Sequence, residues 1–268
     1  MQNLKDKYGN TALVAGASEG LGAAYCHALA AQGLDIVMIA RRKEPLELAA
    51  ADISQKYGVK TYPIACDLAD PNIISIIKQH IADLKVDILV YNAALSHIGP
   101  FLNTDIEEHL KVTTVNIDTT MRLTHYFGGQ MVARGNGAVI LMASLAGFQG
   151  AGFLSTYAST KAFNRVFAES LWYEWKDKHV DVIACCAGAT STPNYINTKP
   201  DKLNFMAPKV QTPEEVVNEC FEKLGTVPSF VTGSGNKLAS FFMANIMTRK
   251  TAVTTMGDAT RQMYKIDY

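Results

Sequence analysis

The sequence lacks the features that mark several classes of protein. Its 268 residues carry 25 Lys and Arg against 25 Asp and Glu, so there is no basic excess to neutralise nucleic-acid phosphates. The five cysteines form no C-x-x-C pair, which favours buried free thiols in a reducing compartment over disulfides or metal ligands. No apolar run is long enough to span a bilayer, and the charged N-terminus lacks the apolar core of a signal peptide. We therefore expect a cytoplasmic protein with no nucleic-acid partner, no membrane span and no bound metal.

Apolar runs alternate with helical patterns through most of the chain. The composition, 48% hydrophobic and 19% charged, suffices for a large buried core. Strands are predicted at residues 11–15, 34–40, 59–66, 86–91, 137–143 and 180–186, and helices at residues 20–32, 44–57, 71–84, 106–134 and 156–178. This order predicts an α/β fold, a single doubly wound parallel sheet of the Rossmann type with helices on both faces. No linker divides residues 1–268, so we expect one domain.

The first predicted strand runs directly into a glycine-rich turn, G-x-x-x-G-x-G, formed by Gly16, Gly20 and Gly22. Glycines at this junction allow a tight turn and let the backbone approach a pyrophosphate at the helix N-terminus. The second strand ends in Arg41 and Arg42, where an NAD site usually has an acidic residue. Arginine there either pairs with a 2′-phosphate or is only a solvated strand end. Together the two features predict nucleotide binding and favour NADP(H) over NAD(H).

Two further strands end in residues suited to a nucleotide. Asp67 follows the third strand and can accept a hydrogen bond from an adenine amine, and residues 92–94 follow the fourth with small side chains. The carboxyl ends of parallel strands form the edge at which such a sheet binds its ligand. The predicted cofactor contacts are Gly16, Ser18, Glu19, Gly20, Leu21, Gly22, Arg41, Arg42, Asp67, Leu68, Asn92, Ala93 and Ala94.

A serine and a Tyr-x-x-x-Lys pair supply candidate catalytic groups. Tyr157 and Lys161 are four residues apart in a helical pattern, so they share one face of the helix. A neighbouring ammonium favours the phenolate and should lower the pKa of Tyr157 from the usual value of about 10. Ser144 follows the fifth strand, and its hydroxyl can hold a substrate oxygen beside Tyr157. The Tyr-x-x-x-Lys pattern is common by chance, so it indicates a catalytic site only in combination with the predicted nucleotide site.

In order and spacing these motifs resemble those of the short-chain dehydrogenase/reductase family, over about residues 8–232. The resemblance implies hydride transfer between a nicotinamide and a carbinol carbon, with Tyr157 as general acid/base. It implies that Lys161 lowers the pKa of Tyr157 and holds the nicotinamide ribose, and that Ser144 orients the substrate oxygen. It also implies that Asn116 supports a water that relays protons from Lys161 to solvent. Further cofactor contacts implied by the family are Gly188, Thr190 and Thr192, together with Tyr157 and Lys161.

Three positions depart from the family pattern. Ala15 stands where Thr is common before the glycine turn, Ala94 replaces the Gly of Asn-Ala-Gly, and Ala187 replaces a Pro before Gly188. These changes affect the fine geometry of the cofactor site and remove no catalytic group.

Within the family the sequence is similar to the bacterial hydroxysteroid dehydrogenases that act on bile acids. The segments that suggest this are residues 4–9, 37–42, 212–215 and 221–225. The likeness implies an NADP(H)-dependent oxidoreductase that interconverts a secondary alcohol and a ketone on a hydroxysteroid. The alternatives are a 3-oxoacyl or general carbonyl reductase and, from another class, a non-catalytic NADP-binding regulator.

The substrate end of the chain is predicted from a long polar connection. Residues 189–210 are typical of a lid, and the tail, residues 233–268, either closes the pocket or packs on a neighbouring subunit of a homodimer or homotetramer. Candidate substrate contacts are Ser144, Phe148, Phe153 and Tyr195, with Phe205 and Met206 as a further apolar cover; ordinary packing is the alternative for the aromatic residues.

Overall fold

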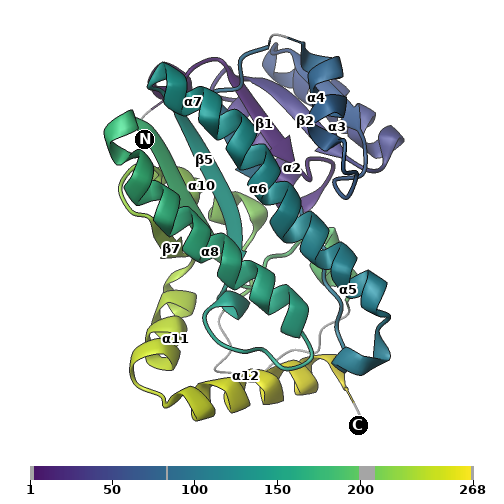
Figure 1. Cartoon of the computed structure of the whole chain (residues 1–268), viewed down its shortest axis with the longest axis vertical. Coiled ribbons are helices and arrows are strands. Elements are labelled where there is room, and N and C mark those ends of the chain that lie inside the picture. The colour runs from purple at the N-terminus through teal and green to yellow at the C-terminus, as the bar shows by residue number, and fades with distance from the viewer. Residues whose placement is uncertain (1–2, 83, 199–208, 267–268) are drawn as a thin grey trace.

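The computed structural model describes residues 3–82, 84–198 and 209–266. Within them, parallel strands form one sheet in the order β3-β2-β1-β4-β5-β6-β7 (Figure 1). The strands are β1 (Thr11–Ala15), β2 (Asp35–Ala40), β3 (Thr61–Ala65), β4 (Ile88–Tyr91), β5 (Gly137–Ser144), β6 (Val180–Ala187) and β7 (Ser229–Val231). The predicted doubly wound parallel sheet is confirmed, and the bounds of its six predicted strands agree within two residues. The short edge strand β7 was not predicted.

Helices cover both faces of this sheet. The α-helices of the described residues are α1 (Leu4–Tyr8), α2 (Gly20–Ala30), α3 (Lys43–Tyr57), α4 (Ile73–Ile81), α5 (Ile106–Thr113), α6 (Thr119–Leu123), α7 (Gly129–Arg134), α8 (Ser155–Trp175), α9 (Pro193–Asn197), α10 (Pro213–Lys223), α11 (Ser234–Asn245) and α12 (Arg249–Tyr264). Alternate residues of β1 enter different cores: Ala12 and Val14 pack with α2, α3 and α10, and Leu13 and Ala15 with α4, α7 and α8. Burial on both faces explains why the central strands β1, β4 and β5 are almost entirely apolar.

The predicted helix over residues 106–134 is one continuous helical segment that contains two non-α-helical turns. Two π-helical turns, Thr114–Asp118 and Thr124–Gly128, separate α5, α6 and α7. The extra residue of a π-helical turn shifts the side chains around it, and such turns are frequent at functional sites. The first of them carries Asn116, which is fully buried.

The C-terminal helices α11 and α12 lie beyond the sheet. Figure 1 shows α12 crossing the end of the molecule near the start of α8. Arg249 donates a hydrogen bond to the carbonyl of Phe148 at 3.0 Å, and Met256 packs in a small cluster with Tyr157. The tail therefore covers the loop that joins β5 to α8.

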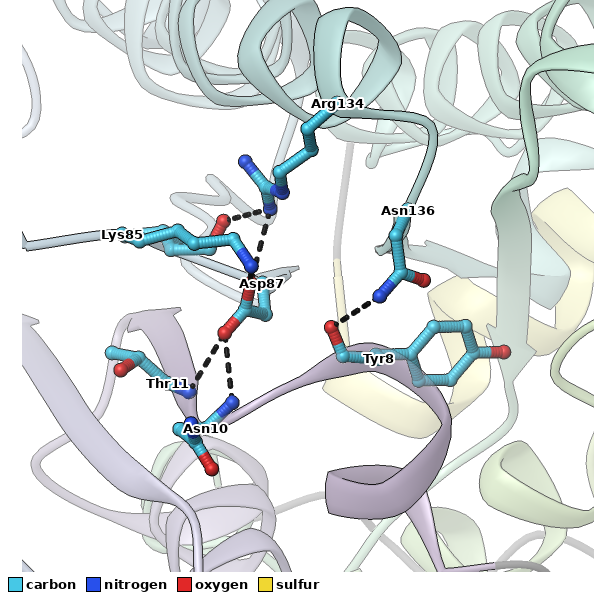
Figure 2. Close-up of polar contacts among 8 residues, drawn as sticks. Tyr8, Asn10, Thr11, Lys85, Asp87, Arg134 and Asn136 are labelled. Carbon is cyan, nitrogen blue, oxygen red and sulfur yellow. Dashed lines mark hydrogen bonds and ion pairs between the residues drawn. The ribbon is translucent and has the colours of Figure 1, made fainter.

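A buried carboxylate joins the elements at the opposite, amino edge of the sheet. Asp87 is 2% exposed and accepts backbone hydrogen bonds from Asn10 at 2.8 Å and Thr11 at 3.2 Å. Figure 2 shows Lys85 and Arg134 on the other side of the same carboxylate, 3.0 and 3.3 Å away. Asp87 thus ties the start of β1 to β4 and α7, far from the carboxyl edge where the candidate site lies.

Candidate active site

The glycine turn between β1 and α2 leaves no room for side chains. Gly16 has φ +82°, and a Cβ there would lie 2.8 Å from the Cα of Ala93. A Cβ on Gly22 would overlap the carbonyl oxygen of Gly16. The side chain of Glu19, the N-cap of α2, makes no capping hydrogen bond, so the N–H groups of the first helical turn stay available to an anion. These features fit the pyrophosphate of a dinucleotide.

A cleft of about 730 Å³ opens at the carboxyl edge of the sheet and brings most of the predicted residues together. Its lining includes these predicted residues: Gly16, Ser18, Glu19, Gly20, Leu21, Arg41, Arg42, Asp67, Leu68, Asn92, Ala93, Ala94, Ser144, Tyr157, Lys161, Gly188, Thr190, Thr192 and Tyr195. Gly22, Asn116, Phe148 and Phe153 are not part of it.

Charged side chains that follow β2 and β3 line one end of the cleft. Arg42 pairs with Glu19 at 2.7 Å, and both side chains are about half exposed. Arg41 is exposed beside it. On the other side, Asp67 lies 3.8 Å from the ammonium of Lys111. The two guanidinium groups follow β2, which is where the 2′-position of an adenosine ribose lies in a nucleotide-binding sheet of this topology.

Ser144, Tyr157 and Lys161 meet where β5 and α8 approach each other. Ser144 is the last residue of β5, and Tyr157 and Lys161 lie one turn apart near the start of α8. The Lys161 side chain is 3% exposed, donates to the carbonyl of Met142 at 2.7 Å and lies 5.6 Å from the centre of the Tyr157 ring. Burial lowers the pKa of Lys161 to about 8.

The pKa of Tyr157 differs from the expectation. Burial raises the pKa of this phenol, the hydrogen bond with Ser144 lowers it, and Tyr264 raises it further, so the net shift is upward. The expected lowering of this pKa by Lys161 is not found: among the described residues the only group that lowers it is Ser144, and desolvation of the phenolate outweighs that hydrogen bond. Tyr157 is therefore a protonated phenol at neutral pH, the form that donates a proton.

Comparison with known proteins identifies the family. The family model described as short chain dehydrogenase matches residues 10–203. The chain belongs to the short-chain dehydrogenase/reductase family. It is thus an oxidoreductase acting on CH–OH groups. The predicted family resemblance is confirmed.

Among curated relatives, the 7beta-hydroxysteroid dehydrogenase of Clostridium sardiniense is 31% identical, over 95% of this chain and 97% of that protein. A very-long-chain 3-oxoacyl-CoA reductase of Bos taurus is 32% identical, over 81% of this chain and 69% of that protein. Among solved structures, one described as giving insights into 7beta-hydroxysteroid dehydrogenase stereoselectivity has a TM-score of 0.89 and 31% identity, covering 95% of this chain and 99% of that one. A short-chain dehydrogenase from Sphingobium yanoikuyae in complex with NADPH has a TM-score of 0.74 and 28% identity, covering 83% of this chain and 87% of that one.

In this short-chain dehydrogenase/reductase, Asn116 holds two parts of the site together. Its side chain accepts from the N–H of Leu95 at 2.8 Å and donates to the carbonyl of Leu95 at 2.9 Å and to the hydroxyl of Thr160 at 3.0 Å. Leu95 lines the cleft, and Thr160 lies on α8 between Tyr157 and Lys161. The proton relay through Asn116 stays a prediction.

The predicted aromatic wall of the substrate end needs correction. Phe148 lies against the guanidinium of Arg165, 4.7 Å from its ring centre, and neither Phe148 nor Phe153 reaches the cleft. Phe205 and Met206 lie outside the described residues. Besides Tyr195, the cleft is lined at this end by three residues that the sequence did not indicate, Ile98, Leu154 and Tyr264.

Tyr264 comes from the last turn of α12, and no local pattern in the sequence points to it. It raises the pKa of both Tyr157 and Tyr195, so the three phenols share one end of the cleft. Among the residues that the structure describes, no helix is both long and apolar enough to cross a membrane. Nor do three His, Cys, Asp or Glu residues of that part of the chain gather in a way that could hold a metal ion.

Proposed function

We propose that this protein is an NADP(H)-dependent oxidoreductase that interconverts a secondary alcohol and a ketone on a hydroxysteroid of the bile-acid type. The observation that carries the proposal is the meeting of Ser144, Tyr157 and Lys161 in the same cleft as the glycine turn and the arginine rim. The similarity to 7beta-hydroxysteroid dehydrogenases over nearly the whole chain supports the substrate class.

NADP(H) is favoured because two guanidinium groups, Arg41 and Arg42, rim the cleft after β2. A 2′-phosphate forms charge-assisted hydrogen bonds with arginine, whereas an unphosphorylated ribose is usually bound by an acidic residue there. The similar short-chain dehydrogenase from Sphingobium yanoikuyae is described in complex with NADPH, which agrees with this choice. When bound, the nicotinamide supplies or accepts the hydride.

The residues of the chain then have separable roles. The hydroxyls of Ser144 and Tyr157 hold the substrate oxygen, and Tyr157 donates a proton to it during ketone reduction. The ammonium of Lys161 stabilises the phenolate that this transfer leaves behind and binds the nicotinamide ribose. Binding of both reactants in one cleft fixes their relative orientation, which supplies much of the rate enhancement.

The substrate end of the cleft suits a bulky ring system. Ile98 and Leu154 contribute apolar surface, and Tyr195 and Tyr264 present aromatic rings with a polar tip. A rigid apolar ring system with a few hydroxyl groups matches such a lining. The second candidate is a reductase of 3-oxoacyl thioesters, which the similarity to very-long-chain 3-oxoacyl-CoA reductases favours.

A substrate panel tests the proposal. The purified protein is assayed with NADPH on keto bile acids, other ketosteroids, 3-oxoacyl thioesters and small ketones, and with NADP⁺ on the matching alcohols. We expect the highest kcat/KM on a bile acid. Activity restricted to thioesters or small ketones would support the second candidate, and NADPH binding without any turnover would indicate a regulator.

A further inference from the structure

A buried histidine outside the predicted site is bonded on both ring nitrogens. His109, on α5, is 7% exposed; its Nε2 lies 3.0 Å from the carbonyl oxygen of Phe101, and its Nδ1 lies 2.8 Å from the hydroxyl of Thr156. Because a carbonyl oxygen only accepts, Nε2 carries the proton, and in the neutral ring Nδ1 accepts from Thr156. The imidazole therefore joins two separate segments.

Both of these segments belong to the candidate active site. Phe101 begins a short 3₁₀ turn that ends the loop after β4, and that loop lines the cleft through residues 92–96 and 98. The ring of Phe101 also stacks on His109, with 4.4 Å between ring centres. Thr156 lies in the first turn of α8, directly before Tyr157. His109 thus connects the loop at the substrate side to the residue that precedes the proton donor.

Asn116 makes a similar connection two helical turns further along. It bonds Leu95 at the start of the same loop and Thr160 on α8. His109 and Asn116 are seven residues apart, and their α8 partners, Thr156 and Thr160, are four residues apart with Tyr157 between them. The long helix therefore fastens the loop and α8 at two points, one on each side of Tyr157.

We propose that His109, acting through Thr156, is a positioning residue that fixes the loop of residues 95–103 relative to Tyr157. This inference rests on the proposed function, since it concerns the alignment of the proton donor with a ketone held by that loop. A displacement of about 1 Å in a reacting group can cost about a hundredfold in rate. Loss of this buried link should therefore lower kcat, and it should leave the cofactor end of the cleft unchanged, because neither His109 nor Thr156 lines the cleft.

A matched pair of variants isolates the hydrogen bond. Thr156→Val keeps the branched shape and removes the hydroxyl, and Thr156→Ser keeps the hydroxyl. With the best ketone substrate of the panel, we expect Thr156→Val to lower kcat about tenfold and Thr156→Ser to stay within about twofold of the parent. The Kd for NADPH, from cofactor fluorescence, should stay within about twofold in both. His109→Phe should lower kcat similarly, and adding Thr156→Val to it should bring no further loss, because both remove the same link.

Hydrogen exchange provides a readout that does not depend on turnover. Peptides covering residues 95–103 should exchange faster in Thr156→Val than in Thr156→Ser. Equal kcat and equal exchange in the two variants would overturn the proposal, as would an equal loss of kcat in both or a large rise in the NADPH Kd.

If Thr156→Val does not fold, His109→Gln and His109→Phe replace the pair, since Gln keeps one donor and one acceptor. If the parent turns over no ketone of the panel, the proposed function fails, and the exchange comparison still decides whether the link exists.

Discussion

The burial of Lys161 gives the site a pH dependence that can be calculated. Burial lowers its pKa from 10.5 to about 8, and burial raises the pKa of Tyr157, so the lysine titrates first as the pH rises. In the proposed function, the charged form of Lys161 binds the ribose and stabilises the phenolate. The kcat/KM of ketone reduction should therefore fall as the pH rises through about 8. For a single ionisation, about half of the activity remains at pH 8 and about a tenth at pH 9.

The assay is kcat/KM for NADPH in ketone reduction, because this parameter reports ionisations of the free enzyme. Measurements at constant ionic strength between about pH 6 and about pH 10 cover the window. The Kd for NADPH, measured over the same range, should rise in parallel because the same ammonium is proposed to bind the ribose. A profile that stays flat to about pH 10, as for an exposed lysine with an ordinary pKa, would refute the reasoning.

Three further variants test other parts of the structure. Arg41→Ala with Arg42→Ala should raise KM for NADPH about tenfold or more and change KM for NADH little, because charge-assisted hydrogen bonds to a 2′-phosphate are lost; equal effects on both cofactors would contradict this. Gly22→Ala should weaken NADPH binding at least about tenfold in a fluorescence titration, since the new Cβ overlaps the carbonyl of Gly16; unchanged binding would show that the turn adapts. Asp87→Ala should lower the free energy of unfolding by about 3 kcal/mol in urea, with kcat retained in the folded fraction; an unchanged transition midpoint would show that the buried carboxylate is dispensable.

Much of the fold could be predicted because its signals are local. Most of the six predicted strands are nearly continuous apolar runs flanked by helical patterns, and burial on both faces makes such runs easy to find. The edge strand β7 is only three residues long and half-buried, so it has no such pattern. Helix α10 does carry a local signal, because Thr212 and Glu215 form a capping box at its start.

The cofactor side of the site could be predicted because a parallel sheet brings the carboxyl ends of its strands to one edge. Residues that follow different strands, such as Gly16, Arg41 and Asn92, therefore line one cleft although they are far apart in the chain. The order of the strands alone brings these residues together, whatever the paths of the loops between them.

The substrate side could not be predicted because its walls come from loops and the tail. Phe148 was expected in the cleft and instead packs on Arg165, and Tyr264 reaches the cleft only because α12 folds back over the β5–α8 loop. The pKa of Tyr157 likewise depends on burial, which the spacing of Tyr157 and Lys161 does not reveal.

The central claim is that the hydroxyl of Tyr157 exchanges the proton while the cofactor exchanges the hydride. Tyr157→Phe removes only that hydroxyl, so it tests the claim most directly. We expect the variant still to bind NADPH and to lose at least about a hundredfold in kcat on the best ketone substrate. A variant that retains near-parental kcat would contradict the account.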